Sequence, residues 1–517
     1  MPSPKPCSTA PSLSRLTPSP SNPRPAAPAR VATQNSHATR PTHACCAHGS
    51  GKPPGPSRKA TAPAAGGLFS PQSQSLGLDQ GEASPAVLEK IVYAGIASNS
   101  FAEASKALHK LADLPVGAKQ TERVTRGIGR ERVAERDAAV AAFAALPLAE
   151  KFRVPPGVTP PDLAAVMVDG GRLQILDRRP SPPDPPPSDP PPEGQPPAAP
   201  AAPATAETWV EEASTVPRSG HWREDKVALL VTMQSAVSDK DPCPEIPESF
   251  VDPTRIPRLV RELRKNVKDA DDAVAEAAEP EAADQALARA TKYQAPQVVQ
   301  RQVVASRGGW PSFAPVVAQA AWAAGFQGAA RRAFVGDGAA NNWALQRSWF
   351  GSFVPILDFI HALSYVFAAA MAGRTFAVGW SCYAEWIGWV WQGQVVRVIA
   401  ALEARQAELG EAEAGEPETS PRAVVARTLR YLRNHQGKMH YEAYRREGLP
   451  LTSSLMESVV KQMNQRVKGT EKFWSEAGSE AVLQLRADHL SDGEPLRGFW
   501  ERRQAAASGQ RRYRKTG

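Results

Sequence analysis

The sequence PSPPDPPPSDPPPEGQPPAAPAAP at positions 180–203 limits the fold more than any other stretch of this chain. Proline lacks the backbone N–H that helices and sheets need, so this run is excluded from helix interiors and central strands. We expect an extended spacer over 178–217 that interrupts a larger folded domain at 160–491. Residues 1–84 are also rich in Pro, Ser, Ala and Thr and lack apolar periodicity, so we expect a disordered tail there.

Several short apolar stretches predict β-strands. In VMVDGGRLQIL (166–176), two apolar runs flank Asp-Gly, which favours a tight turn, so we predict a hairpin that turns at Asp169. HWREDKVALLVTM (221–233) supplies a third strand, and RRAFVGDG (331–338) and FVPILDFI (353–360) supply two more on either side of a helix. Strands and helices in this order predict an α/β fold.

Helices are predicted over 254–294, over 361–410 and in a region at 85–155. In the last of these, an apolar pattern of helical spacing is broken by DLPVGA (113–118) and resumes in KQTERVTRGIGRERV (119–133), which carries four arginines. Helix, turn and basic helix form the pattern of a helix-turn-helix unit that binds DNA. A small helical hairpin without DNA affinity has the same pattern, and both interpretations stay open.

Three carboxylates stand at the ends of predicted elements. Asp169 and Asp337 each follow an apolar strand and precede glycine, and Glu457 lies near the start of a helix predicted within 448–474. Each has a local explanation: the aspartates as turn residues, and Glu457 as the partner of Ser454 in a capping box. Two strand ends and one helix start are also how a fold brings distant acids to one point, so we predict a shared site.

Clustered carboxylates favour a particular cofactor. Mg²⁺ prefers hard oxygen ligands, and two such ions about 3.5–4 Å apart need several carboxylates. We therefore predict that Asp169, Asp337 and Glu457 are metal ligands and catalytic residues for displacement at phosphorus. Two Mg²⁺ ions are expected, with Mn²⁺ as a substitute.

Positive charge is concentrated near the C-terminus. The formal net charge is +8, and residues 421–517 carry 19 Lys and Arg against 10 Asp and Glu, a balance of 19 − 10 = +9. This predicts a polyanionic partner, although a surface that only aids solubility has the same composition. We expect a basic tail at 492–517. Four basic residues on or just after the Glu457 helix are predicted to contact DNA: Lys461, Arg466, Lys468 and Lys472.

Two features of that helix have further interpretations. The spacing of Glu457 and Lys461 also fits an i,i+4 helix pair without any DNA contact. Asn464 is a polar residue on an apolar-spaced helix, and we expect it to face the site.

The most apolar stretch, at 354–373, is about long enough to cross a bilayer. Asp358 and His361 would be costly inside a membrane, so we predict buried soluble structure instead. The N-terminus lacks the apolar core of a signal peptide, and the five cysteines form no CxxC pair. We expect a cytoplasmic protein that does not contact membranes.

Seven stretches together resemble the ISKra-type bacterial insertion-sequence transposases: VMVDGGRLQILD, WREDKVALLVTM, DPCPEIPESF, RAFVGDGAANNW, PILDFIHALSYVFAAAM, GLPLTSSLMESVVKQMNQRVKGTEKFW and AVLQLRADHLSD. The similarity runs from about residue 90 to the C-terminus, apart from the proline spacer, and is most specific over 331–373 and 448–491. It implies a ribonuclease H-like mixed sheet with a helical insertion at 362–447 before the last acid.

The resemblance also implies roles. Asp169, Asp337 and Glu457 match an Asp-Asp-Glu metal triad, and Asp358 and His361 match an Asp-x-x-His motif near the site. A histidine that simply packs at a helix start is the alternative for His361. The implied activity is Mg²⁺-dependent DNA cleavage and strand transfer, performed by a multimer on terminal inverted repeats and target DNA. The implied location is the bacterial cytoplasm, at the nucleoid when DNA is bound.

Two other functions fit the same residues. One is a non-catalytic DNA-binding relative, such as a repressor or a repurposed transposase. The other is a ribonuclease H-like nuclease without strand transfer. The three acids favour the transposase and the nuclease over the non-catalytic relative. Inverted repeats with short target duplications beside the gene would favour the transposase over the nuclease.

Overall fold

The computed structural model describes residues 60–61, 68–69, 83–176, 221–268, 294–413, 415–469 and 472–507. The proline spacer predicted at 178–217 lies outside these residues, as does most of the tail predicted at 1–84. All the described residues belong to one compact unit, which spans 46–517. Within the predicted tail, strands β1 (Ala60–Thr61) and β2 (Leu68–Phe69) pair antiparallel.

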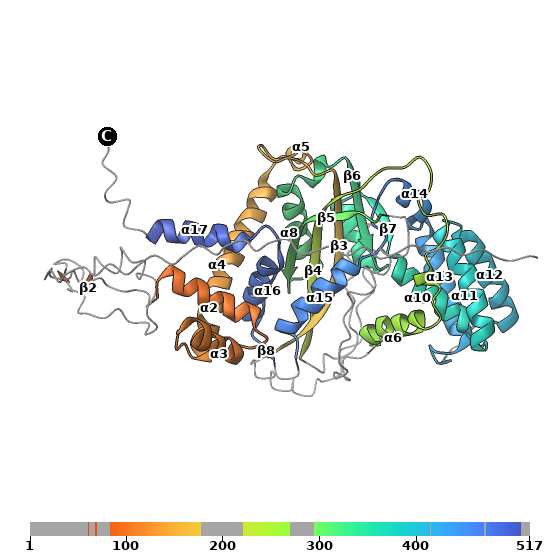
Figure 1. The fold of residues 1–517 in the computed structure, drawn as a ribbon, viewed down its shortest axis with the longest axis horizontal. Helices are drawn as coiled ribbons and strands as arrows, with labels where there is room; N and C mark the ends of the chain where they lie inside the picture. Colours follow the sequence, from red (N-terminus) through yellow and green to blue (C-terminus); the bar gives the residue numbers. More distant parts are fainter. Residues whose placement is uncertain are drawn as a thin grey trace, which may run out of the picture. The chain divides into compact units, whose positions relative to one another are not determined.

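A mixed sheet lies at the centre of the described structure (Figure 1). Five strands follow the order β5-β4-β3-β6-β7, and the short β8 (Phe473–Trp474) pairs with the end of β3. Their bounds are β3 (Leu163–Ile175), β4 (Trp222–Gln234), β5 (Gln297–Ser306), β6 (Arg331–Gly336) and β7 (Val354–Leu357). β4 is antiparallel to both β3 and β5, whereas β6 is parallel to both β3 and β7. The predicted α/β fold is confirmed.

The hairpin predicted at Asp169 is wrong. β3 continues through Asp169, Gly170 and Gly171, and each of these residues pairs with a residue of β4. The apolar runs on both sides of Asp169 are buried in the same core. Long-range pairing with β4 and burial of one continuous strand outweigh the local turn preference of Asp-Gly.

The third antiparallel strand is β5, which the apolar pattern did not predict. β5 lies at the edge of the sheet, and its first four residues, 297–300, are exposed. A half-exposed edge strand carries a weaker apolar pattern than a central one. The number of early strands was therefore right, but their identity was not.

Helices cover both faces of the sheet, to which successive residues of a strand point in turn. On the face of Asp169 lie α15 (Ser454–Val467), against β3 and β4, and α16 (Glu476–Leu490), against β5. On the other face lie α8 (Trp310–Ala323) and α9 (Ala340–Trp349). There the Lys226 Nζ is 5.4 Å from the centroid of the Trp310 ring.

The described part of the insertion predicted at 362–447 is mainly helical. Its helices are α10 (Phe359–Met371), α11 (Phe376–Trp391), α12 (Val395–Leu409), α13 (Pro421–His435) and α14 (Tyr441–Arg446). The apolar stretch 354–373 forms β7 and α10, and in the described ranges no helix is both long and apolar enough to span a membrane. α6 (Arg255–Lys268) confirms the first part of the helix predicted at 254–294; the part beyond 268 lies outside the described residues.

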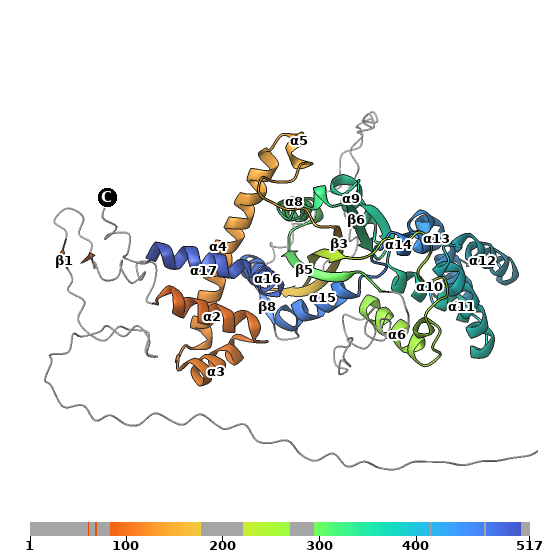
Figure 2. The same cartoon turned by 45° about the horizontal axis from the view of Figure 1, so that its top comes forward.

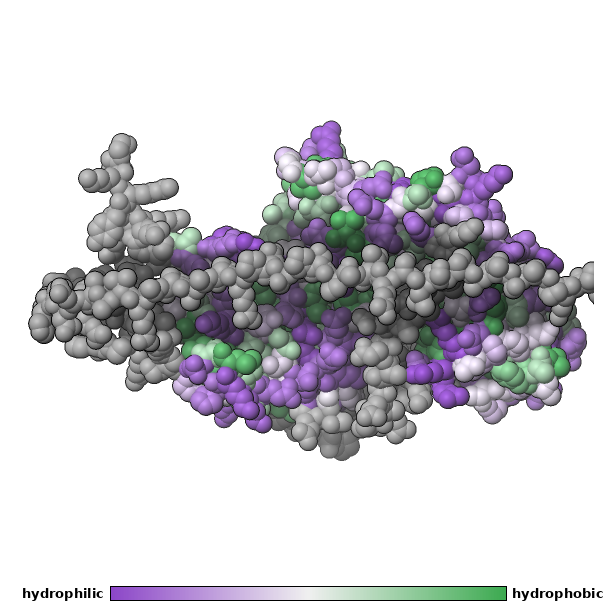
Figure 3. Space-filling model, in the orientation of Figure 1, coloured by the Kyte–Doolittle hydropathy of each residue, from purple (hydrophilic) through white to green (hydrophobic). Residues whose placement is uncertain are grey.

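The outer helices of this insertion mix polar and apolar surface. α11 and α12 expose the apolar side chains of Phe376, Val378 and Val396. At the end of the structure formed by these helices, Figure 3 shows hydrophobic residues among hydrophilic ones.

Four helices precede the sheet: α2 (Pro85–Ala97), α3 (Phe101–Ala112), α4 (Ala118–Ala145) and α5 (Leu148–Lys151). The break predicted in DLPVGA is present, but α4 is 28 residues long and packs along α2, α8 and α16 (Figure 2). Of its four predicted arginines, Arg123 and Arg130 are exposed. Arg132 instead pairs with Asp488 of α16 at 3.0 Å. The basic face of α4 is thus divided between the surface and an interior contact.

The tail predicted at 492–517 needs correction. Residues 495–507 form α17 (Pro495–Ala507), which packs against α2 and α16. Phe499 and Trp500 of α17 are buried with Val92 and Ile96 of α2. Burial of these two aromatic rings explains why the segment is a helix rather than a tail; 508–517 lie outside the described residues.

Candidate active site

Three aspartates stand in one row where the parallel pairing ends: Asp169 within β3, Asp337 just after β6 and Asp358 just after β7. The last pair of the β3–β6 ladder lies two residues before Asp169 and Asp337. The last pair of the β6–β7 ladder lies one residue before Asp337 and Asp358. Because neighbouring strands are about 4.8 Å apart, continuing these registers brings the three residues side by side.

Asp169 is largely buried on the face covered by α15. Its Oδ1 accepts a hydrogen bond of 2.7 Å from the Gly170 N–H. Burial, followed by the negative charge of Asp337, raises the pKa of Asp169 to about 6. A carboxylate in this position therefore gains stability from any cation that enters the site.

Asp337 is held by contacts from two helices. Its Oδ1 accepts hydrogen bonds of 2.9 Å from the Ala339 N–H and 2.9 Å from Asn342 Nδ2, both at the start of α9. From the helical insertion, the Tyr431 hydroxyl donates to the Asp337 carbonyl at 2.8 Å. Gly338 has φ +104°, and a Cβ there would lie 2.8 Å from the Tyr431 ring, so glycine is needed at this turn. Sequence reasoning missed both Asn342 and Tyr431.

Asp358 joins two helix starts. Its side chain is 1% exposed, and its Oδ1 caps α10 by accepting from the N–H groups of Ile360 at 2.6 Å and His361 at 3.0 Å. Its Oδ2 accepts from the N–H of Ser453 at 2.5 Å and from the Ser453 hydroxyl, at the start of α15. Both oxygens are engaged, so Asp358 acts as an anchor between the starts of α10 and α15.

His361 lies among the acids. Its Nδ1 is 3.6 Å from Asp358 Oδ1, an ion-pair distance that is too long for a hydrogen bond. Burial would lower the pKa of His361, but the charges of Asp358, Asp337 and Glu457 outweigh it and raise the pKa to about 9. His361 is therefore positively charged at neutral pH and partly offsets the acids around it.

Glu457 projects from the first turns of α15. The capping box predicted with Ser454 is absent: the helix cap is Ser453, which makes no side-chain bond to the helix and donates its hydroxyl to Asp358. Burial, followed by the charge of Asp358, raises the pKa of Glu457, and Asp169 adds to the shift. Glu457 thus shares an electrostatic environment with the aspartate row.

A fifth carboxylate, Asp225 of β4, lies beside this group. Burial raises the pKa of Asp225 to about 7, and the charges of Glu224 and Asp169 contribute. Asn464 of α15 faces the same place, as expected from its position on the helix. The signal that could have identified Asp225 is the acidic pair Glu224–Asp225 at the start of an apolar strand.

The donor set has the chemistry of a site for a hard cation. Carboxylate oxygens are the ligands that Mg²⁺ prefers, and the mutual repulsion that raises the pKa of Asp169 would be relieved by such an ion. Within the described residues, however, no three His, Cys, Asp or Glu side chains already converge as a metal-binding group. The side chains would have to adjust around an entering ion.

The four predicted DNA contacts differ in exposure. Lys461 and Lys468 are exposed, whereas Lys472 is partly buried and donates to the Gln465 carbonyl at 2.8 Å. Arg466 is 2% exposed; its guanidinium lies 4.3 Å from the centroid of the Phe101 ring, and its Nε donates to a carbonyl of α2. Arg466 is enclosed by protein, so the described structure does not offer it for the predicted phosphate contact.

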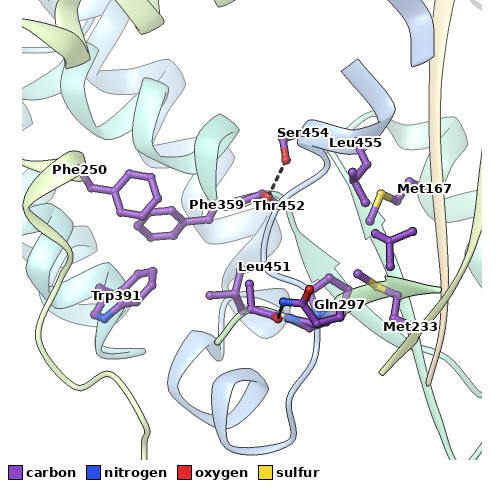
Figure 4. Close-up of a pocket in the computed structure, with 14 residues that line it drawn as sticks. Met167, Met233, Phe250, Gln297, Phe359, Trp391, Leu451, Thr452, Ser454 and Leu455 are labelled. Atoms are coloured by element: carbon purple, nitrogen blue, oxygen red, sulfur yellow. Dashed lines mark hydrogen bonds between the residues drawn. The ribbon is translucent and has the colours of Figure 1, made fainter. Parts of the chain in front are cut away.

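An apolar cavity of about 370 Å³ lies below the start of α15 (Figure 4). Met167 and Met233 of the sheet line one side, and Phe250, Phe359 and Trp391 line the other. Its few polar groups include the hydroxyls of Thr452 and Ser454, which are 3.3 Å apart. The cavity therefore lies between the sheet and these aromatic side chains.

Comparison with known proteins adds no assignment. No protein-family model matches the chain, and no curated protein is significantly similar to it in sequence.

Proposed function

We propose that this chain is a DNA transposase of an insertion sequence, with a catalytic domain of ribonuclease H-like fold. Support for the fold comes from the mixed sheet: three antiparallel strands, two parallel strands that carry acids at their ends, and a later helix that carries Glu457. The resemblance of the sequence to ISKra-type transposases points to the same arrangement.

One observation carries the proposed chemistry. Asp169, Asp337 and Glu457 come from positions far apart in the chain. Nevertheless, the charge of Asp337 helps to raise the pKa of Asp169, and the charge of Asp169 helps to raise the pKa of Glu457. Repelling carboxylates that only stabilised the fold would be paired with arginine or lysine. Here His361 and Lys461 are nearby cations, but the pKa values of Asp169 and Glu457 stay raised beside them.

Asp169, Asp337 and Glu457 would hold two Mg²⁺ ions, or Mn²⁺ in their place. Bound magnesium would supply activation of the attacking oxygen and neutralisation of charge on the leaving oxygen. The N–H of Ala339 and the Asn342 amide keep the Asp337 carboxylate oriented toward the site. The exposed Lys461, one helical turn beyond Glu457, is placed to attract a DNA phosphate.

The proposed partners are the terminal inverted repeats of the element and target DNA. The exposed Arg123 and Arg130 of α4 support a role for the N-terminal helices in binding the repeats. The proposed active form is a multimer that assembles on paired DNA ends in the bacterial cytoplasm.

The test uses a plasmid carrying the DNA that flanks the gene, together with a second plasmid as target. The full chain with Mg²⁺ should cut at the repeat ends and join the freed 3′ hydroxyl to the target, and EDTA should abolish both reactions. Glu457→Gln should lose both activities, whereas the exposed control Glu442→Gln should keep them. Cutting without joining would indicate the nuclease, and binding without cutting would indicate the non-catalytic relative; either result overturns the proposal.

A further inference from the structure

Asp225 is a buried carboxylate that the proposed chemistry leaves unexplained. It pairs with Gly171 across the β3–β4 ladder, so its side chain lies on the same face as Asp169, which is two residues from Gly171. The side chain is 0% exposed, and neither of its oxygens makes a hydrogen bond with the described residues.

A second oxygen donor faces it from α15. Asn464 follows Glu457 by seven residues, so both lie on one face of the helix. The Asn464 Oδ1 is also buried and makes no hydrogen bond with the described residues. Figure 1 shows helix α15 next to strands β3 and β4, which it contacts.

These oxygens border one small space above Gly171. A Cβ at Gly171 would lie 2.9 and 3.1 Å from the two Asp225 oxygens and 3.0 Å from the Asn464 Oδ1. Any side chain at this position would collide with the oxygens, so glycine is what lets them approach strand β3 this closely. Three oxygens from two distant elements thus converge at one place, and none of them has a hydrogen-bond partner among the described residues.

The ligand must be positively charged or donate hydrogen. Lys226 follows Asp225 in the chain, but its Nζ binds Glu224 at 3.0 Å and lies over Trp310 on the opposite face of the sheet. A buried carboxylate that has no partner among the described residues is strongly unfavourable unless it binds a proton or a cation. Two carboxylate oxygens and one amide oxygen form a donor set suited to a hard divalent cation.

We propose that Asp225 and Asn464 help to bind one of the two divalent cations of the acidic site, Mg²⁺ or Mn²⁺, at a position beside Asp169 on the β4 side. Asp225 is then a fourth carboxylate ligand of the acidic site, and Asp169 lies between this position and Asp337. The proposal deepens the proposed function, but it concerns cation binding alone and holds without any DNA reaction.

The test is to measure Mn²⁺ binding to the full chain without DNA, by electron paramagnetic resonance of free Mn²⁺ and by calorimetry. Wild type should bind about two Mn²⁺ per chain. Asp225→Asn should lose one of these ions or weaken its binding about tenfold or more. Asp337→Asn should keep the ion at Asp225 while weakening the other. If Asp225→Asn binds Mn²⁺ with the same number and affinity as wild type, the proposal is overturned.

A second variant separates binding from folding. Gly171→Ala keeps every oxygen donor, but its Cβ would collide with them and push them apart, so it should also weaken the ion beside Asp169. Circular dichroism establishes whether each variant is folded; if Asp225→Asn is not, Gly171→Ala decides. Unchanged binding by a folded Gly171→Ala protein contradicts the proposal. If the wild-type protein binds Mn²⁺ as predicted but does not cut DNA, the proposed function is refuted and this inference still holds.

Discussion

Asp337 and Asp358 are neighbours in the aspartate row, but their surroundings give them different roles. Asp358 uses both oxygens to hold the first residues of α10 and α15. Asp337 Oδ1 accepts two hydrogen bonds on the side of α9. Position in the row therefore does not by itself identify a metal ligand. A ligand also needs a carboxylate oxygen that is not already used to hold the fold.

This difference predicts that the same Asp→Asn substitution lowers the free energy of unfolding much more at Asp358 than at Asp337. Asp358→Asn removes a charged acceptor and places an amide against N–H donors, so the free energy of unfolding should fall by about 2 kcal/mol or more. Asp337→Asn keeps the Oδ1 acceptor, so its free energy of unfolding should change by less than about 1 kcal/mol. Urea denaturation at neutral pH measures both, and equal losses would contradict the assigned roles.

A pH dependence is predicted for the pair of Asp241 and Arg445. Arg445 is 1% exposed, and its Nε donates to Asp241 Oδ1 at 2.8 Å. Burial would raise the pKa of Asp241, but the hydrogen bonds from Arg445 and from the Cys243 N–H outweigh it and lower the pKa. A lowered folded-state pKa means that the stabilisation is complete above the unfolded pKa, about 3.9, and is lost as the pH falls through the folded value.

Asp241→Asn should therefore reduce the free energy of unfolding by about 3 kcal/mol at pH 7, because the Arg445 charge stays buried. The difference from wild type should shrink below about pH 4. Denaturation curves of both proteins between pH 7 and pH 3 test this, and a constant difference across that range would count against the pair.

At the scale of elements, α15 joins the site to the N-terminal helices. Its first turns carry Glu457 and receive the Asp358 anchor, whereas Arg466 near its end reaches a carbonyl of α2 and the rings of Phe101 and Trp474. One face of α15 carries the polar residues Glu457 and Asn464 toward the site, and the last turn of the helix packs against the N-terminal helices through Arg466. Movement of α2 would therefore displace the helix that carries Glu457.

Two substitutions on α15 separate packing from DNA contact. Arg466→Ala should lower the free energy of unfolding by about 3 kcal/mol through lost packing. Lys461→Ala, on the exposed face, should change the stability by less than about 0.5 kcal/mol, but should weaken DNA binding and reduce the salt slope by about 1. Denaturation and DNA titrations at several salt concentrations measure these effects, and the reverse pattern would restore Arg466 as the phosphate contact.

Local patterns predicted the elements whose partners are close in sequence. β6, α9 and β7 follow one another within residues 331–357, and the sequence pattern identified all of them. β3 was misread at Asp169 because its partner strand, β4, lies beyond the proline spacer. The convergence of Asp225, Gly171 and Asn464 was not predictable, since it depends on pairing between three distant segments.

At the scale of the whole described unit, the N-terminal helices share a core with the sheet domain. Arg132 of α4 binds Asp488 of α16, and the Asp488 side chain is 6% exposed. Burial raises the pKa of Asp488, against the opposing effect of Arg132. The boundary predicted between 85–155 and 160–491 is therefore crossed by a buried ion pair.

Breaking that pair should destabilise both parts together. Asp488→Asn leaves Arg132 without its buried partner, so the free energy of unfolding should fall by about 3 kcal/mol or more, in one cooperative transition. The matched control is Glu403→Ala, which removes the partly exposed pair with Arg433 and should change stability by less than about 1 kcal/mol. Calorimetry that resolved two independent transitions would contradict the shared core.

The most direct test of the proposed catalyst is the rate of Mg²⁺-dependent DNA cleavage by Asp337→Asn. This variant keeps the hydrogen-bond acceptor and the fold, and the exposed Asp239→Asn is its control. We predict that Asp337→Asn cuts at least about a hundredfold more slowly than wild type, while Asp239→Asn cuts at the wild-type rate. Cleavage by Asp337→Asn at the wild-type rate would contradict the assignment of the acidic site.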